Sequence, residues 1–132
     1  MATFNSINEA KEYFKGDRFA TLNGMELDEL DERHSLCSLA LDDRHKNANG
    51  GIMGGVMFTL ADFAFAALVN NIHLPTVAQQ VSINFLSAPK GEKLFSKAEI
   101  IKNGRTSSVV SVTVFDGENR NVALFTGTGF KL

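Results

Sequence analysis

A single carboxylate, Asp62, lies in the middle of an otherwise apolar stretch, Val56–Val69. Burying a carboxylate among phenylalanine and alanine side chains is costly unless a partner or a function compensates it. The preceding segment, His45–Gly55, is polar and contains four glycines. Such a loop at the start of a helix presents free main-chain N–H groups, which favour an anion or a carbonyl oxygen gaining negative charge. Together these features predict acyl-transfer chemistry, with Asp62 as base or nucleophile.

The spacing between the two parts of this candidate site limits how it can be assembled. Gly54 and Asp62 are eight residues apart, which on one helix separates them by about 12 Å at 1.5 Å per residue. One carbonyl group cannot easily contact both residues of the same chain. The sequence therefore predicts a site shared by two subunits whose core helices lie side by side and antiparallel, as in a C2 dimer. Two simpler interpretations remain open: the glycines form only a tight turn, and Asp62 is a structural carboxylate.

The elements that must position these residues follow from the hydrophobic pattern. A capping box at Ser6–Glu9 predicts a short helix to about Phe14, and Asp17–Leu22 adds another turn. Residues 56–69 are predicted to form a helix that is apolar all round and therefore buried. The predicted strands are Met25–Leu30, His34–Leu41, Val81–Phe85, Lys93–Ile101, Val110–Val114 and Val122–Phe130.

The order of these elements predicts the fold class. Two strands, one buried helix and then four strands in a meander indicate an α+β fold, in which a curved antiparallel sheet wraps round the long helix. Asn103-Gly104 predicts a hairpin with a type I′ turn, because that turn needs positive φ at both central residues.

Composition and length set broad limits. The 132 residues, 44% of them hydrophobic, predict one domain over residues 1–132. A net charge of -2 argues against a nucleic-acid or anionic-membrane partner held by bulk charge. The apolar helix also falls short of the ~20 apolar residues that a bilayer requires. The lone cysteine, Cys37, cannot form an internal disulfide, which predicts a core residue and a reducing, cytoplasmic setting.

A longer pattern connects the loop to the helix. It is His45-x-Asn47-x-x-Gly50-x-x-x-Gly54-Gly55-x-x-x-Thr59-Leu60-Ala61-Asp62-x-Ala64. The pattern resembles the hotdog-fold acyl-CoA thioesterases of the PaaI (phenylacetate degradation) type. The likeness continues through Ile83–Pro89, the turn Lys102–Arg105 and the last strand. The resemblance implies hydrolysis of coenzyme A thioesters without a metal or other cofactor, by homodimers that usually pair into tetramers.

The resemblance also implies roles for individual residues. Asn47 would hold the thioester region, the Gly54 amide would polarise the carbonyl, and Asp62 of the facing subunit would attack it or activate water. Other residues expected to bind substrate are Gly55, Met53 and Phe58 beside the helix start, and Lys90, Lys102 and Arg105 in turns that could reach the phosphates of coenzyme A. Turn lysines and arginines are also often only solvated.

Two departures from the family pattern keep alternatives open. The family usually has histidine where this chain has Met53, and many members place a hydroxyl near Ala78. Because methionine donates no hydrogen bond, a non-catalytic protein that binds or senses acyl-CoA is the main alternative. A hotdog dehydratase would need a catalytic histidine beside the core helix. The spacing of the histidines indicates no zinc site, and His45 is expected to bond within its loop.

Overall fold

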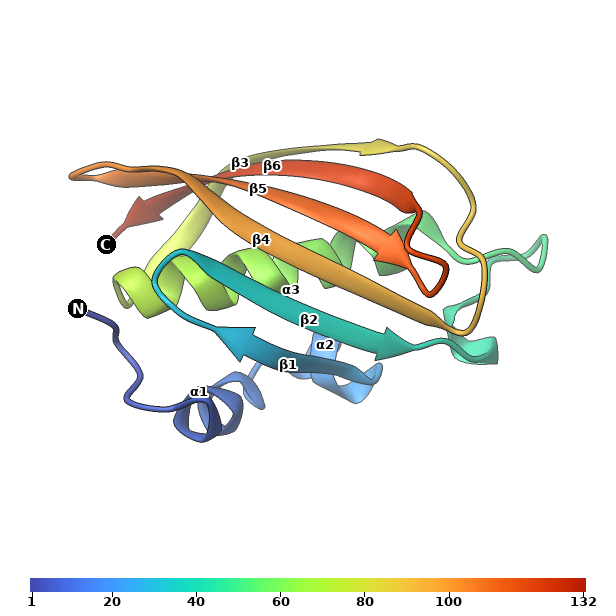
Figure 1. Cartoon of the computed structure of the whole chain (residues 1–132), viewed down its shortest axis with the longest axis horizontal. Helices are drawn as coiled ribbons and strands as arrows, with labels where there is room; N and C mark the ends of the chain where they lie inside the picture. The colour runs from blue at the N-terminus through green and yellow to red at the C-terminus, as the bar shows by residue number, and fades with distance from the viewer.

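The chain folds as one antiparallel sheet curved round a long helix (Figure 1), in a computed structural model that describes residues 1–132. The strands are β1 (Met25–Leu30), β2 (His34–Ala40), β3 (Thr76–Phe85), β4 (Lys93–Asn103), β5 (Ser107–Asp116) and β6 (Asn121–Lys131). The helices are α1 (Ile7–Phe14), α2 (Arg18–Leu22) and α3 (Gly54–Ile72), with a short 3-10 turn, η1 (Asp43–His45). The predicted α+β hotdog architecture is confirmed.

The core lies between α3 and the concave face of the sheet. Val110, Val112 and Val114 of β5 are all buried, as their period-2 alternation predicted. Two buried serine hydroxyls bond to α3: Ser35 Oγ donates to the Ala64 carbonyl at 2.6 Å and Ser96 Oγ to the Leu60 carbonyl at 2.8 Å. The sheet therefore fixes the rotation and the axial position of the helix that carries Asp62.

By length and composition alone, α3 could cross a membrane. In this fold more than half of its residues are buried, and strands of the sheet cover it along its length (Figure 1). Gly127 makes room for this packing, because a Cβ there would lie 2.8 Å from the Phe65 ring. Its apolar surface is thus used in the core, as the sequence predicted.

The strand order corrects the predicted meander. The sheet order is β1-β2-β4-β5-β6-β3, so β4, β5 and β6 form a meander while β3 crosses to the far edge and pairs with β6. The crossover places β2 beside β4. The sheet therefore ends in two different edge strands, β1 and β3.

Two local predictions need correction. The predicted type I′ turn is wrong, because neither Asn103 nor Gly104 has a positive φ. Three residues connect β4 and β5, and the Gly104 N–H donates to the Ser107 carbonyl at 2.8 Å. At α1, Ser6 Oγ accepts the Glu9 N–H as predicted, but the reciprocal bond of a full capping box is absent.

Candidate active site

The start of α3 has unpaired main-chain donors. Met53 is the N-cap residue, and its side chain makes no capping hydrogen bond. The N–H groups of Gly54 and Gly55 donate to no other main-chain or side-chain group of the chain. Since these donors lie at the positive end of a 19-residue helix, they can bind a partial or full negative charge.

Asn47 shapes the loop that precedes these donors. Its side-chain oxygen accepts the N–H groups of Asn49 at 2.9 Å and Gly51 at 3.1 Å. Its main-chain N–H donates to the Gly51 carbonyl at 2.7 Å. The side-chain NH₂ makes no hydrogen bond within the chain, so Asn47 supports the loop with its oxygen and retains two free donors.

His45 joins three parts of the site. The ring is 1% exposed; Nδ1 accepts the Asp42 N–H at 3.0 Å and Nε2 donates to the Asn23 carbonyl at 2.8 Å. These two bonds assign the neutral tautomer with its proton on Nε2. The His45 carbonyl accepts the Met53 N–H at 3.0 Å. His45 bonds within its loop, as predicted, and also ties that loop to the end of α2 and the start of α3.

Asp62 is half-buried on α3 and faces α2. It shares a pocket of about 380 Å³ with Asp17, Phe19 and Phe58, among others. Burial, and then the nearby charge of Asp17, raise the pKa of the Asp62 carboxyl above its usual value. No hydrogen bond or salt bridge within the chain stabilises its ionised form. A half-buried carboxyl group with a raised pKa and no partner within the chain is a candidate functional residue.

A second pocket, of about 310 Å³, lies beside the helix start. Met53, Gly55 and Phe58 line it, together with Phe19. Three residues expected to bind substrate are therefore brought together here. Gly54 instead lies against the Phe85 ring of β3, and a Cβ at this position would come within 3.2 Å of that ring.

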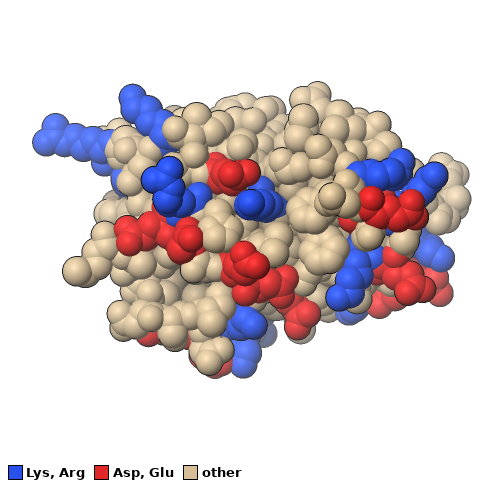
Figure 2. All heavy atoms as spheres, in the orientation of Figure 1, with Lys and Arg blue, Asp and Glu red and all other residues tan.

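The three predicted phosphate-binding residues do not come together within one chain. Lys90 lies in the β3–β4 loop, and its N–H donates to the Asp116 carboxylate. Lys102 and Arg105 belong to the β4–β5 hairpin at the opposite end of β4. Figure 2 shows basic side chains projecting at that end of the molecule. The 11 residues of β4 span about 35 Å, so one coenzyme A on one chain cannot use both groups.

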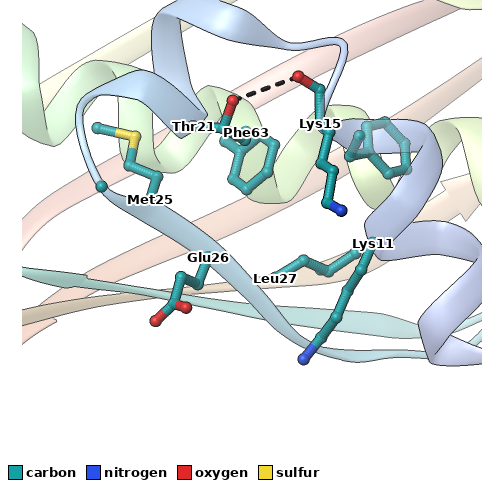
Figure 3. Close-up of a pocket in the computed structure, with 9 residues that line it drawn as sticks. Lys11, Lys15, Thr21, Met25, Glu26, Leu27 and Phe63 are labelled. Carbon is teal, nitrogen blue, oxygen red and sulfur yellow. Dashed lines mark hydrogen bonds between the residues drawn. The ribbon is translucent and has the colours of Figure 1, made fainter.

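A further pocket, of about 340 Å³, lies between α1, α2, β1 and α3. Figure 3 shows Lys11 of α1 and Lys15, which follows this helix, on one side of the pocket and Met25 and Glu26 on the other, with Phe63 between them. Phe63 also lines the Asp62 pocket. Phe63 therefore borders both pockets, and none of the predicted site residues lines the one that contains the lysines.

Sequence reasoning missed the contribution of α2. Asp17 and Phe19 both line the Asp62 pocket, although Asp17–Leu22 was interpreted only as an additional turn. A signal was present in this segment, because Phe19 is its one aromatic residue and follows the charged pair Asp17-Arg18. The Phe19 side chain is 74% exposed and lines this pocket.

The sheet, the enclosed helix and the open donors at its start place this chain in the hotdog fold class. Residues 49–123 match the thioesterase superfamily. The chain belongs to this superfamily, and its fold is that of the PaaI-type hotdog thioesterases.

Individual relatives agree with this assignment. The acyl-coenzyme A thioesterase PaaI of Escherichia coli K12 is 27% identical over 120 residues, covering 90% of this chain and 86% of that protein. The solved structure of E. coli PaaI, from the phenylacetic acid degradation operon, has a TM-score of 0.88 at 25% identity and covers 95% and 91% of the two chains. A hypothetical thioesterase of Streptococcus pneumoniae TIGR4, solved with coenzyme A, has a TM-score of 0.81 at 30% identity, covering 89% of this chain and 94% of that chain.

Proposed function

We propose that this protein hydrolyses acyl-CoA thioesters to a free acid and coenzyme A, at a site shared by two copies of the chain. The observation that carries the proposal is the arrangement on α3, where unpaired N–H groups and an unpaired carboxylate are separated by eight residues. The names of the relatives support the substrate class, since one is an acyl-coenzyme A thioesterase and another was solved with coenzyme A.

Each group has a defined task in this reaction. The Gly54 N–H of one copy donates to the thioester oxygen and stabilises its developing negative charge, and the Asn47 side-chain NH₂ holds the thioester region. Asp62 of the other copy either attacks the carbonyl carbon or takes a proton from the attacking water. In the first route the C–S bond breaks, the thiolate of coenzyme A leaves, and water then hydrolyses the acyl–Asp62 anhydride.

The two sheet edges favour β3 as the contact between the copies. β1 presents three acidic residues, Glu26, Asp28 and Glu29, and charged side chains protect an edge from pairing. β3 has no charged residue over its ten positions, and Val77 and Phe85 on it are about half exposed. Antiparallel pairing of two β3 strands would set two α3 helices side by side and antiparallel.

The same pairing supports the proposed phosphate contacts and assembly. It turns the β4–β5 hairpin of one copy toward the end of the dimer that holds the other copy's α3 start. Lys102 and Arg105 from one copy and Lys90 from the other would then lie at the same end. Exposed Leu124 and Phe130 on β6 offer a further contact through which dimers would pair into tetramers.

Mixing two inactive variants tests the shared site. Asp62→Asn and Asn47→Ala should each abolish thiol release from acyl-CoA, while Asp28→Asn, on the exposed β1 edge, should not. Random reassociation of equal amounts gives half heterodimers with one intact site each, so activity should return to about a quarter of the wild-type value. A mixture that stays inactive contradicts the shared site. Near-normal turnover by Asp62→Asn, or a wild type that binds acyl-CoA without hydrolysing it, contradicts the proposed reaction.

A further inference from the structure

Two pockets adjoin along α3 and form one groove between Met53 and Asp62. They have volumes of about 380 and 310 Å³ and share Phe19, Phe58 and Thr59. We propose that this groove binds the acyl group of the substrate, and that Phe19 of α2 covers the chain and sets the preferred chain length. The inference rests on the proposed thioesterase function, because it takes the position of the thioester carbonyl from Asp62.

The middle of the groove fits an uncharged, apolar acyl group. Its walls between the two ends are formed mainly by Phe19, Phe58 and Met53. The hydroxyl of Thr59 donates to the Gly55 carbonyl at 2.8 Å, so its proton is not offered to a ligand. The charged groups are confined to the ends, and they are Asp17, Arg18 and Asp62 at one end and Arg44 at the other.

The length of the groove indicates a chain of medium length. Gly55 and Asp62, which line its two halves, are seven residues apart on α3, or about 10 Å along the helix. A chain that starts at Asp62 can therefore extend by about two helical turns before it reaches the start of α3. Each volume is also in the range of pockets that enclose small ligands, about 300 to 1,000 Å³.

Phe19 is held over this groove by the C-terminal end of its short helix. The Asn23 side-chain NH₂ donates to the Phe19 carbonyl at 2.6 Å, and Arg44 Nη1 donates to the Leu22 carbonyl at 3.0 Å. The Asn23 carbonyl in turn accepts His45 Nε2. The backbone of α2 is thus fixed, while the Phe19 side chain is 74% exposed. An acyl chain in the groove would cover much of this exposed ring.

Chain-length dependence of kcat/KM tests the inference. For the wild type, kcat/KM should rise about fourfold per added methylene from acetyl-CoA until the groove is filled. Phe19→Ala should lower the ratio of kcat/KM for octanoyl-CoA to that for acetyl-CoA by about tenfold, and Phe19→Trp should move the optimum to shorter chains. Leu22→Ala is the matched control, because Leu22 is on the same helix, is 72% exposed and lines neither pocket.

The outcomes distinguish this inference from the proposed function. Hydrolysis of acyl-CoA with the same chain-length dependence in wild type and Phe19→Ala overturns the inference and leaves the thioesterase function intact. No hydrolysis of any acyl-CoA by the wild type overturns both. Light scattering measures the oligomeric state of Phe19→Ala. Dissociation of the oligomer would assign Phe19 to a subunit contact and overturn its role in chain-length selection.

Discussion

His45 gives the sharpest test of how the site is held together. Its ring is buried and makes two hydrogen bonds, one from the Asp42 N–H and one to the Asn23 carbonyl. Replacement by alanine removes both bonds and leaves a donor and an acceptor without partners. One other side chain connects η1 to α2: Arg44 donates to the Leu22 carbonyl, and its side chain is about half exposed.

The expected loss of stability follows from these two bonds. A buried polar group left unpaired costs about 1–3 kcal/mol. Water can reach the partly exposed Asp42 and Asn23, which favours the lower half of that range for each group, and the vacated ring volume adds to the loss. We expect His45→Ala to lower the free energy of unfolding by about 3 kcal/mol. For a chain of this length that corresponds to a fall in Tm of about 10 °C.

Urea unfolding of His45→Ala, monitored by circular dichroism, measures this loss directly. His34→Ala is the control, because His34 is half-buried and bonds only to exposed Glu29 and Asp31; we expect less than about 1 kcal/mol there. A loss below about 1 kcal/mol for His45→Ala would show that the two bonds do not anchor the loop. The variant should also lose kcat, because residue 45, whose main-chain carbonyl positions Met53 at the start of α3, would lose its side-chain anchor to the end of α2.

Four further predictions each concern a single residue. Met53→His should raise kcat two- to tenfold, or about 0.4–1.4 kcal/mol, with little change in KM. The main-chain N–H groups at the start of α3 would be held more rigidly, and their orientation matters mainly in the transition state. A lower KM at constant kcat would point to ground-state binding instead. Burial, and then the charge of Asp17, raise the pKa of the Asp62 carboxyl group. The folded state therefore favours the protonated carboxyl group, and the protein loses stability as the pH rises through the pKa of the folded state. Asp62→Asn should therefore melt at a higher temperature than the wild type at pH 7, and Asp17→Asn should move the acid limb of the kcat/KM profile to lower pH; an unchanged limb would dismiss the coupling. Burial by itself raises the pKa of Asp116, but main-chain N–H groups and the Arg120 side chain lower it to about 2. Its stabilising effect is complete above the unfolded pKa of about 3.9 and is lost as the pH falls toward 2, so Asp116→Asn should flatten the acid part of the curve of Tm against pH.

Local sequence patterns predict a helix or strand correctly where its buried residues recur at a regular spacing. The alternating valines of β5 and the continuous apolar run of α3 predicted both elements, because each pattern reflects one face or one whole surface in contact with the core. The same patterns could not specify the strand order. Nothing in Thr76–Phe85 distinguishes β4 from β6 as a partner, since that choice depends on the path of the chain over the helix.

The Asn103-Gly104 turn shows a local rule overridden by side-chain contacts. The Asn103 side-chain oxygen accepts hydrogen bonds from Ser108 Oγ at 3.0 Å and Lys131 Nζ at 2.7 Å. Lys131 Nζ also donates to the Gly104 carbonyl. These contacts come from β5 and from the end of β6, so they stabilise a longer connection that a two-residue turn rule does not include.

The sequence predicts the chemical groups of the candidate site but not all the residues that surround them. Asp62 could be identified because a carboxylate is exceptional in an apolar helix, and the glycines because they cluster directly before and at the start of that helix. The contribution of Asp17 and Phe19 arises only when α2 packs beside α3, a contact between segments about 40 residues apart. Residue type alone does not reveal such a contact.

Helix α3 combines two features that lower stability, one at its start and one at Asp62, and this supports a functional reason for both. Serine or aspartate at position 53 would accept the Gly55 N–H and add about 1 kcal/mol, yet the Met53 side chain caps no main-chain donor. Capping is available elsewhere in the same loop, because the Asp42 carboxylate accepts the Arg44 N–H and Asn47 accepts two others. Further along the same helix, Asp62 remains half-buried without a partner. A helix selected for stability alone would have neither feature, whereas a helix that must bind a polarised carbonyl and supply a reactive carboxylate requires both.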